Sequence, residues 1–93
     1  MTSEKDSDAI LDDCRELAEQ IVTRFGTAKI MIATAESCTG GLIAGMITEI
    51  AGSSAVFDRG FVTYANAAKV DMLGVKQETL DTHGAVSPGT AVE

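Results

Sequence analysis

Aromatic residues and proline are scarce in this 93-residue chain, which has no tryptophan, one tyrosine, three phenylalanines and one proline. Its core must therefore come from aliphatic and methionine side chains, since aromatic rings are too few to fill it. Basic residues are also few, seven against 14 acidic ones, which gives a net charge of −7. Because no cluster of lysine or arginine is available to neutralise phosphates, we expect no nucleic-acid partner.

Long apolar runs and metal-ligand patterns are missing as well. No stretch approaches the roughly 18 apolar residues of a membrane span, and the polar residues 1–8 lack the apolar segment of a secretory signal. Two cysteines, Cys14 and Cys38, without a secretory signal indicate free thiols in a reducing compartment. We therefore expect a cytoplasmic protein without a membrane partner, and no metal site, because the single histidine, His83, has no cysteine or carboxylate at ligand spacing.

The chain does contain alternating helix and strand patterns. Apolar residues at three-and-four spacing predict an acidic leader helix over about residues 8–25, with Ser7 as its N-cap and Gly26 as its stop signal. An apolar, β-branched run predicts a strand over 29–35 that is buried on both faces. Cys14 lies on the apolar stripe of the helix and is expected in the core.

Later segments repeat this alternation. The expected elements are a helix over 42–50, a second strand over 57–64, a helix over 66–73 capped by Asn66, a helix over 77–83, and a helix that begins at Ser87-Pro88. The order strand, helix, strand predicts a βαβ unit in an α/β fold. Two strands are too few for a stable layer, so we expect the chain to be part of a larger domain.

The segment Glu36-Ser37-Cys38-Thr39-Gly40-Gly41 lies between the first strand and the helix that follows it. Ligands bind at the carboxyl ends of strands in open α/β sheets, and backbone N–H groups at a helix start suit an anion or an oxyanion. Ser37 is therefore a candidate nucleophile and Cys38 the runner-up. The alternative is that Ser37 or Thr39 merely caps the helix.

Lys69 is the second candidate, in the segment Tyr64-Ala65-Asn66-Ala67-Ala68-Lys69. A cation in the first turn of a helix is disfavoured by the helix dipole, and such a position suits a lysine that acts as a base. The alternative is a solvated surface lysine. Arg59 is expected either to bind a phosphate or to pair with Asp58.

The motif Glu36–Gly41, together with Ile50-Ala51-Gly52-Ser53-Ser54, Gly60-Phe61-Val62-Thr63-Tyr64 and Gly84-Ala85-Val86-Ser87, resembles the CinA C-terminal domain family in order and spacing. The resemblance implies a three-layer α/β/α sandwich. Residues 1–93 would then be a single domain of this family, truncated at its C-terminus. Members tend to be oligomeric, so a homo-oligomer is expected.

The resemblance also implies an activity. The family includes amidohydrolases that convert nicotinamide mononucleotide to nicotinate mononucleotide and ammonia, without a metal or other cofactor. By resemblance, Ser37 is the nucleophile, Lys69 the base and Tyr64 an assisting group. The substrate or its oxyanion would be held by the remaining site residues, Thr39, Gly40, Gly41 and Asn66.

Two points qualify this expectation. Ala65 and Ala67 replace the serine and glutamate that are commoner in the family's Tyr-Ser-Asn-Glu segment. The family domain also continues past the position of Glu93 with a further ligand-contacting loop. The rival hypothesis is a non-catalytic nucleotide-binding or regulatory module, in which the Ser37 loop holds a phosphate and Lys69 is a counter-charge.

Overall fold

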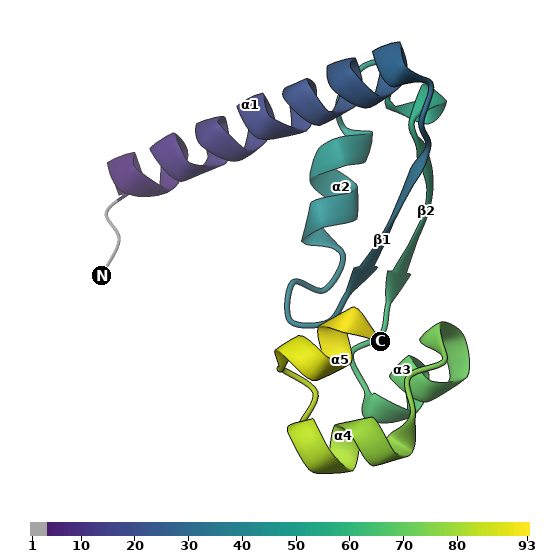
Figure 1. Ribbon diagram of the computed structural model, residues 1–93. Coiled ribbons are helices and arrows are strands. Elements are labelled where there is room, and N and C mark those ends of the chain that lie inside the picture. The colour runs from purple at the N-terminus through teal and green to yellow at the C-terminus, as the bar shows by residue number, and fades with distance from the viewer. Residues whose placement is uncertain (1–3) are drawn as a thin grey trace. The chain divides into compact units, whose positions relative to one another are not determined.

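The computed structural model describes residues 4–93 and divides into two compact units (Figure 1). The first unit contains the described residues up to Thr34 together with Leu42–Gly60. The second contains Ala35–Gly41 and Phe61–Glu93. Within residues 4–93 the structure contains helices and a parallel sheet of two strands, which confirms the predicted α/β class. Among the described residues, no helix has both the length and the apolar character needed to cross a membrane.

The first unit begins with α1, Glu4–Ala28, which is longer than the predicted helix at both ends. Ser7 lies inside α1 and is not its N-cap, because helix-forming Glu4 and Lys5 extend the helix toward the N-terminus. Gly26 also lies inside the helix and does not stop it. The helix ends instead in a Schellman motif, in which Lys29 has a φ of 58° and the Ile30 N–H donates to the Phe25 carbonyl at 3.0 Å.

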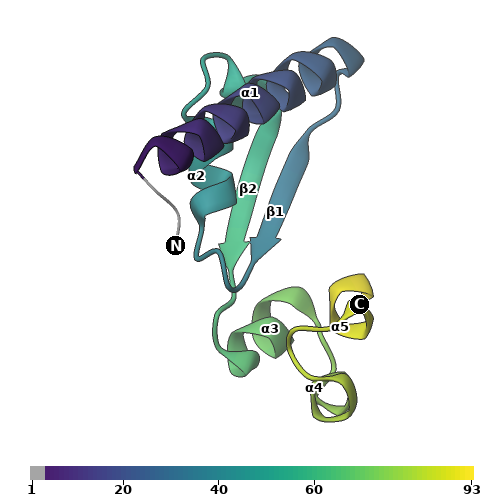
Figure 2. The same cartoon turned by 90° about the vertical axis from the view of Figure 1, so that its left-hand side faces the viewer.

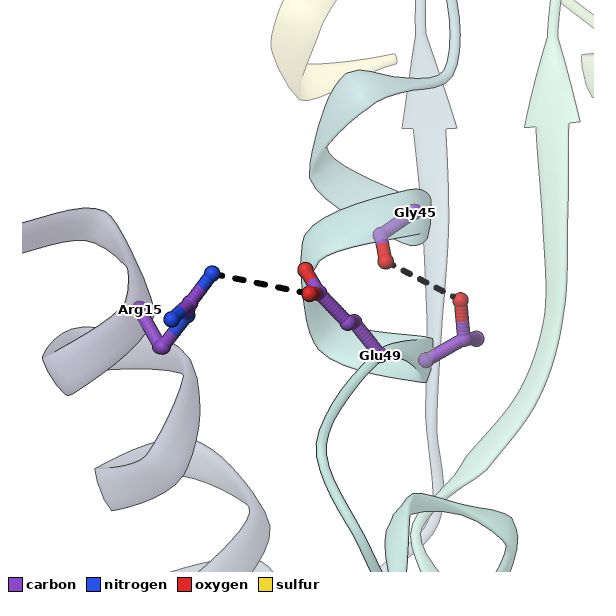
Figure 3. Close-up of polar contacts among 4 residues, drawn as sticks. Arg15, Gly45 and Glu49 are labelled. Atoms are coloured by element: carbon purple, nitrogen blue, oxygen red, sulfur yellow. Dashed lines mark hydrogen bonds and ion pairs between the residues drawn. The ribbon is translucent and has the colours of Figure 1, made fainter. Parts of the chain in front are cut away.

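Helix α1 packs on α2, Leu42–Thr48, through an apolar cluster in the first unit. Val22, Ile47 and Val56 are its buried members, and Phe25, Ile32, Ile50 and Phe57 pack against them. Figure 3 shows the ion pair of Arg15 with Glu49, at 3.6 Å, and the Gly45 carbonyl, which accepts a hydrogen bond from the Thr48 hydroxyl. Both partners of the ion pair are largely exposed, so the apolar cluster dominates the packing of the two helices.

The two strands, β1 (Ile32–Glu36) and β2 (Phe57–Val62), lie side by side with the same direction (Figure 2). A short 3₁₀ helix, Ser53–Ala55, precedes β2. The prediction that the first strand is buried on both faces is wrong: exposed and partly buried residues alternate along β1 until Glu36. This alternation is typical of a sheet that is covered on one face.

The second unit carries three short helices, α3 (Asn66–Leu73), α4 (Gln77–His83) and α5 (Pro88–Val92). Ala65, not Asn66, is the N-cap of α3, because the Ala65 carbonyl already accepts the N–H groups of Ala68 and Lys69. The predicted start of α5 is confirmed, since the Ser87 hydroxyl accepts the Thr90 N–H at 3.2 Å.

Candidate active site

The loop after β1 is held by two overlapping hydrogen bonds. The Thr39 hydroxyl donates to the Glu36 carboxyl at 2.7 Å, and the Gly40 N–H donates to the Ser37 carbonyl at 3.0 Å. Gly40 and Gly41 have φ values of 60° and 100°, which suit glycine. A Cβ on Gly41 would also lie 3.3 Å from a Val62 methyl group. The loop therefore needs glycine at both positions for its shape, whatever else these residues do.

Lys69 lies in the first turn of α3 and is only 5% exposed. Its Nζ donates to the carbonyl of Thr63 at 2.7 Å and to that of Tyr64 at 3.1 Å. The alternative of a solvated surface lysine is therefore wrong. The reason is that these two carbonyls replace part of the hydration shell that the buried amine loses.

Ser37 and Lys69 line one cavity of about 770 Å³, whose lining comes entirely from the second unit. Glu36, Cys38 and Thr63 also line it, and the far wall is formed by residues around α5. Ser37 is half-buried and Cys38 is exposed. The cavity therefore has a hydroxyl, a thiol, a buried amine and a buried carboxyl in its wall, and its volume is in the range of small-ligand sites.

The other candidate residues lie outside the cavity lining. Tyr64 is 73% exposed, and the part of it that reaches the site is its carbonyl, which binds Lys69. Thr39, Gly40, Gly41 and Asn66 are not among the lining residues either. The Gly40 N–H is already engaged by Ser37, whereas the roles proposed for the other groups stay predictions.

The sequence analysis also named three residues outside the proposed site, and the structure shows the surroundings of each. Arg59 forms an ion pair with Asp58 at 2.6 Å, which favours the pairing alternative over phosphate binding. Cys14 is only partly buried on α1 and is not part of the buried apolar cluster, so the expectation that it lies in the core is not met. His83 is exposed in the last turn of α4.

Two residues of the site were missed at the sequence level. Glu36 is 4% exposed and Thr63 is 2% exposed, and both line the cavity. An acid at the last position of an apolar strand, directly before the candidate nucleophile, was a signal for Glu36, because a carboxyl group is rarely buried without a specific partner. Thr63 contributes backbone atoms, which leave no signal in the residue type.

Comparison with known proteins gives consistent matches. The model of the CinA C-terminal domain matches residues 14–93. The nicotinamide-nucleotide amidohydrolase PncC of Escherichia coli is 55% identical over 78 residues, which are 84% of this chain and 47% of that protein. A CinA-like protein of Chloroherpeton thalassium is 58% identical over 77 residues, 83% of this chain and 18% of that protein.

The solved structures agree. The crystal structure of the competence/damage inducible protein CihA from Agrobacterium tumefaciens matches with a TM-score of 0.84 and 68% sequence identity, over 86% of this chain and 48% of that one. This chain thus spans about half the length of the PncC and CihA proteins that it matches. With the family model matched over residues 14–93 and the fold shared with CihA, the chain belongs to the CinA C-terminal domain family.

Proposed function

We propose that the site hydrolyses the carboxamide of nicotinamide mononucleotide to the carboxylate and ammonia, with Ser37 as the nucleophile and Lys69 as the base. The observation that carries the proposal is the presence of both side chains in the wall of one cavity, with the amine buried. The name of the E. coli relative, nicotinamide-nucleotide amidohydrolase, supports the substrate. The family's motif supports the choice of residues.

The hydrogen bonds of Lys69 are compatible with a base. A neutral amine has two N–H groups and one lone pair. Its two N–H groups match the carbonyls of Thr63 and Tyr64, which lie 2.7 and 3.1 Å from Nζ. The lone pair is then left to accept the proton of Ser37 as the hydroxyl attacks the amide carbon.

The later steps follow from the chemistry of amides. The tetrahedral intermediate carries an oxyanion, for which backbone N–H groups of Thr39 and Gly41 are the proposed donors. Ammonia leaves after it takes a proton from Lys69, with Tyr64 as the assisting group. Water then attacks the acyl group on Ser37 while Lys69 again accepts the proton. The bond between the acyl carbon and the Ser37 oxygen breaks, Lys69 returns the proton to that oxygen, and the acid product leaves as the carboxylate.

Ammonia release from nicotinamide mononucleotide tests the proposal. Ser37→Ala and Lys69→Ala should each lower kcat by about 10³-fold or more, because a serine and its base act as a unit. Lys69→Arg should fail to the same degree, since a guanidinium stays protonated. The matched controls are Ser54→Ala and Lys76→Arg, which alter exposed residues outside the cavity and should leave turnover within about twofold.

Two outcomes would contradict this assignment. Near-normal turnover by Lys69→Arg would make Lys69 a fixed charge, and the base would have to be another group. Loss of turnover in Cys38→Ala but not in Ser37→Ala would transfer the nucleophile's role to Cys38, the other nucleophilic side chain of the loop in the cavity wall.

One observation favours the non-catalytic alternative. The two carbonyls that receive the Lys69 Nζ also suit a permanently charged ammonium, which would act as a counter-charge for a bound phosphate. Calorimetric titration with nicotinamide mononucleotide separates the two functions. Binding by the wild type without any ammonia release, together with retained binding in Lys69→Arg, would support the binding module and contradict the amidase.

A further inference from the structure

We infer that Glu36 is a positioning residue for Ser37, which it holds in place through the hydroxyl of Thr39. The inference rests on the proposed function in one respect, namely that Ser37 is the reacting group. The structural part of the inference is that the Glu36–Thr39 contact sets the shape of the loop. This part can be tested without any measurement of turnover.

The backbone of Glu36 is held in place by the neighbouring strand. Its carbonyl accepts the N–H of Thr63 at 2.8 Å, so the last residue of β1 is tied to the end of β2. Its side chain is 4% exposed, although carboxyl groups are among the groups most costly to bury. A buried carboxyl at the end of a strand is therefore a rigid point from which a loop can be held.

The side chain of Glu36 forms a hydrogen bond with a residue on the far side of Ser37 in the sequence. Glu36 Oε1 accepts the hydroxyl of Thr39 at 2.7 Å, and this bond spans Ser37 and Cys38. The bond from the Gly40 N–H to the Ser37 carbonyl closes the next four residues, 37–40, and is offset from the first closure by one residue. Ser37 thus lies inside the closure made by the Glu36 side chain and is the first residue of the closure made by the backbone.

The same strand end positions the proposed base. Thr63 donates its N–H to the Glu36 carbonyl and accepts the Lys69 Nζ at its own carbonyl, at 2.7 Å. A single residue, 2% exposed, therefore connects the residue before Ser37 with Lys69. Lys69 is held on one side of this link, and on the other side the Glu36–Thr39 bond is a side-chain contact that holds the loop.

Amide hydrogen exchange of Gly40, followed by NMR on the full chain, tests the structural part of the inference. Thr39→Val removes the donor at an exposed position and keeps the side chain's shape, so it should fold and should raise the exchange rate about fivefold or more. Thr39→Ser keeps the hydroxyl and should stay within about twofold of the wild type.

Measurements of turnover then test whether the Glu36–Thr39 contact positions Ser37 for the reaction. Thr39→Val should lower kcat about tenfold and change KM less than about twofold, because a misplaced nucleophile affects the chemical step more than binding. Thr39→Ser should restore kcat. Unchanged Gly40 exchange and unchanged kcat in Thr39→Val would overturn the inference. If the wild type releases no ammonia, the proposed function fails, and the exchange measurement alone decides whether Glu36 holds the loop.

Discussion

The catalytic role proposed for Lys69 and its structural role make different demands on its amine. The proposed base must exchange a proton, whereas the burial of Lys69 and its bonds to the carbonyls of Thr63 and Tyr64 make it part of the scaffold. Removal of the amine leaves these carbonyls without their donor, and an unsatisfied buried acceptor costs more than a hydrogen bond contributes. Loss of activity in a Lys69 variant must therefore be separated from loss of stability.

Lys69→Met measures the structural role, since it keeps the length of the side chain and removes the amine. We expect it to lower the free energy of unfolding by about 1–3 kcal/mol, as measured by urea denaturation. Lys76→Met, at an exposed position, is the matched control and should change stability by less than about 0.5 kcal/mol. Equal free energies of unfolding for Lys69→Met and the wild type would show that the hydrogen bonds from the amine to the two carbonyls do not stabilise the fold.

The residue-level predictions from sequence succeeded where a residue type constrains its own surroundings. A lysine in the first turn of a helix conflicts with the helix dipole, and this conflict correctly marked Lys69 as unusual. Glu36 was not singled out, because the burial of a carboxyl group depends on tertiary contacts. The assisting role of Tyr64, implied by the family resemblance, stays a prediction, and the contact observed at Tyr64 is made by its carbonyl.

At the scale of elements, Gly60 lies where the first unit leaves little space for a side chain. A Cβ at this position would lie 2.9 Å from the Thr34 hydroxyl oxygen, 3.2 Å from the Ala44 Cβ and 3.3 Å from the Phe57 ring. Ala44 belongs to α2 and Thr34 to β1, so the missing side chain lets helix and sheet approach each other. The Thr34 hydroxyl oxygen is buried there without a hydrogen-bond partner.

Gly60→Ala should therefore destabilise the protein by about 1–3 kcal/mol, the usual cost of overpacking. Gly45→Ala is the matched control. Gly45 lies inside α2 with nothing within 4 Å of its would-be Cβ, so the change should stabilise by about 0.5–1 kcal/mol. Thermal unfolding of both variants measures the difference, and a stabilising Gly60→Ala would show that α2 can shift away from the strand.

Glu93 links α4 to α5 in a pH-dependent way. The Thr79 hydroxyl and then the Lys76 N–H donate to its carboxylate, both at 2.6 Å, and they hold the pKa of Glu93 below its ordinary value of 4.5. A lowered pKa in the folded state means that this stabilisation is complete above the unfolded value. It is lost as the pH falls from about 4.5 through the lower pKa of the folded state.

Glu93→Gln should consequently lower the unfolding temperature at pH 7 and have no effect once the pH lies below the folded pKa. Thermal unfolding of wild type and variant between pH 7 and pH 3 measures this convergence. Thr79→Val removes the main donor and should reduce the pH-dependent difference. Parallel curves at all pH values would contradict the assignment of this pH dependence to Glu93.

Most elements could be predicted because their signals are local. Gly74 ends α3, Gly84 follows α4, and Ser87-Pro88 begins α5, as their residue types indicate. The end of α1 was placed too early because a lysine, Lys29, adopts the left-handed conformation that usually marks a glycine. The burial of β1 was overestimated, since an apolar run does not reveal how many faces of a strand are covered.

At the scale of the whole chain, the two units differ in what they bury. The buried side chains of the first unit are mainly apolar: Ala18, Val22, Ile47 and Val56, with Ser53 as the polar member. Those of the second unit are mainly polar: Glu36, Thr63, Lys69 and Thr90, with Val75 and Leu80 as the apolar members. Burial of apolar surface is the dominant stabilising term, whereas polar groups gain little beyond the water contacts they lose.

We therefore expect the second unit, which contains the candidate site, to open more readily than the first. Hydrogen exchange followed by mass spectrometry should show faster exchange in peptides from α3 to α5 than in peptides from α2 and from residues 18–28 of α1. A saturating nucleotide that binds the cavity should slow exchange in the second unit selectively, because it stabilises only the closed form of the part it contacts. Equal exchange in the two units without ligand would show that the polar interior is as resistant to opening as the apolar one. Stability at the site would then have to come from the hydrogen bonds of Glu36 and Lys69 rather than from apolar burial.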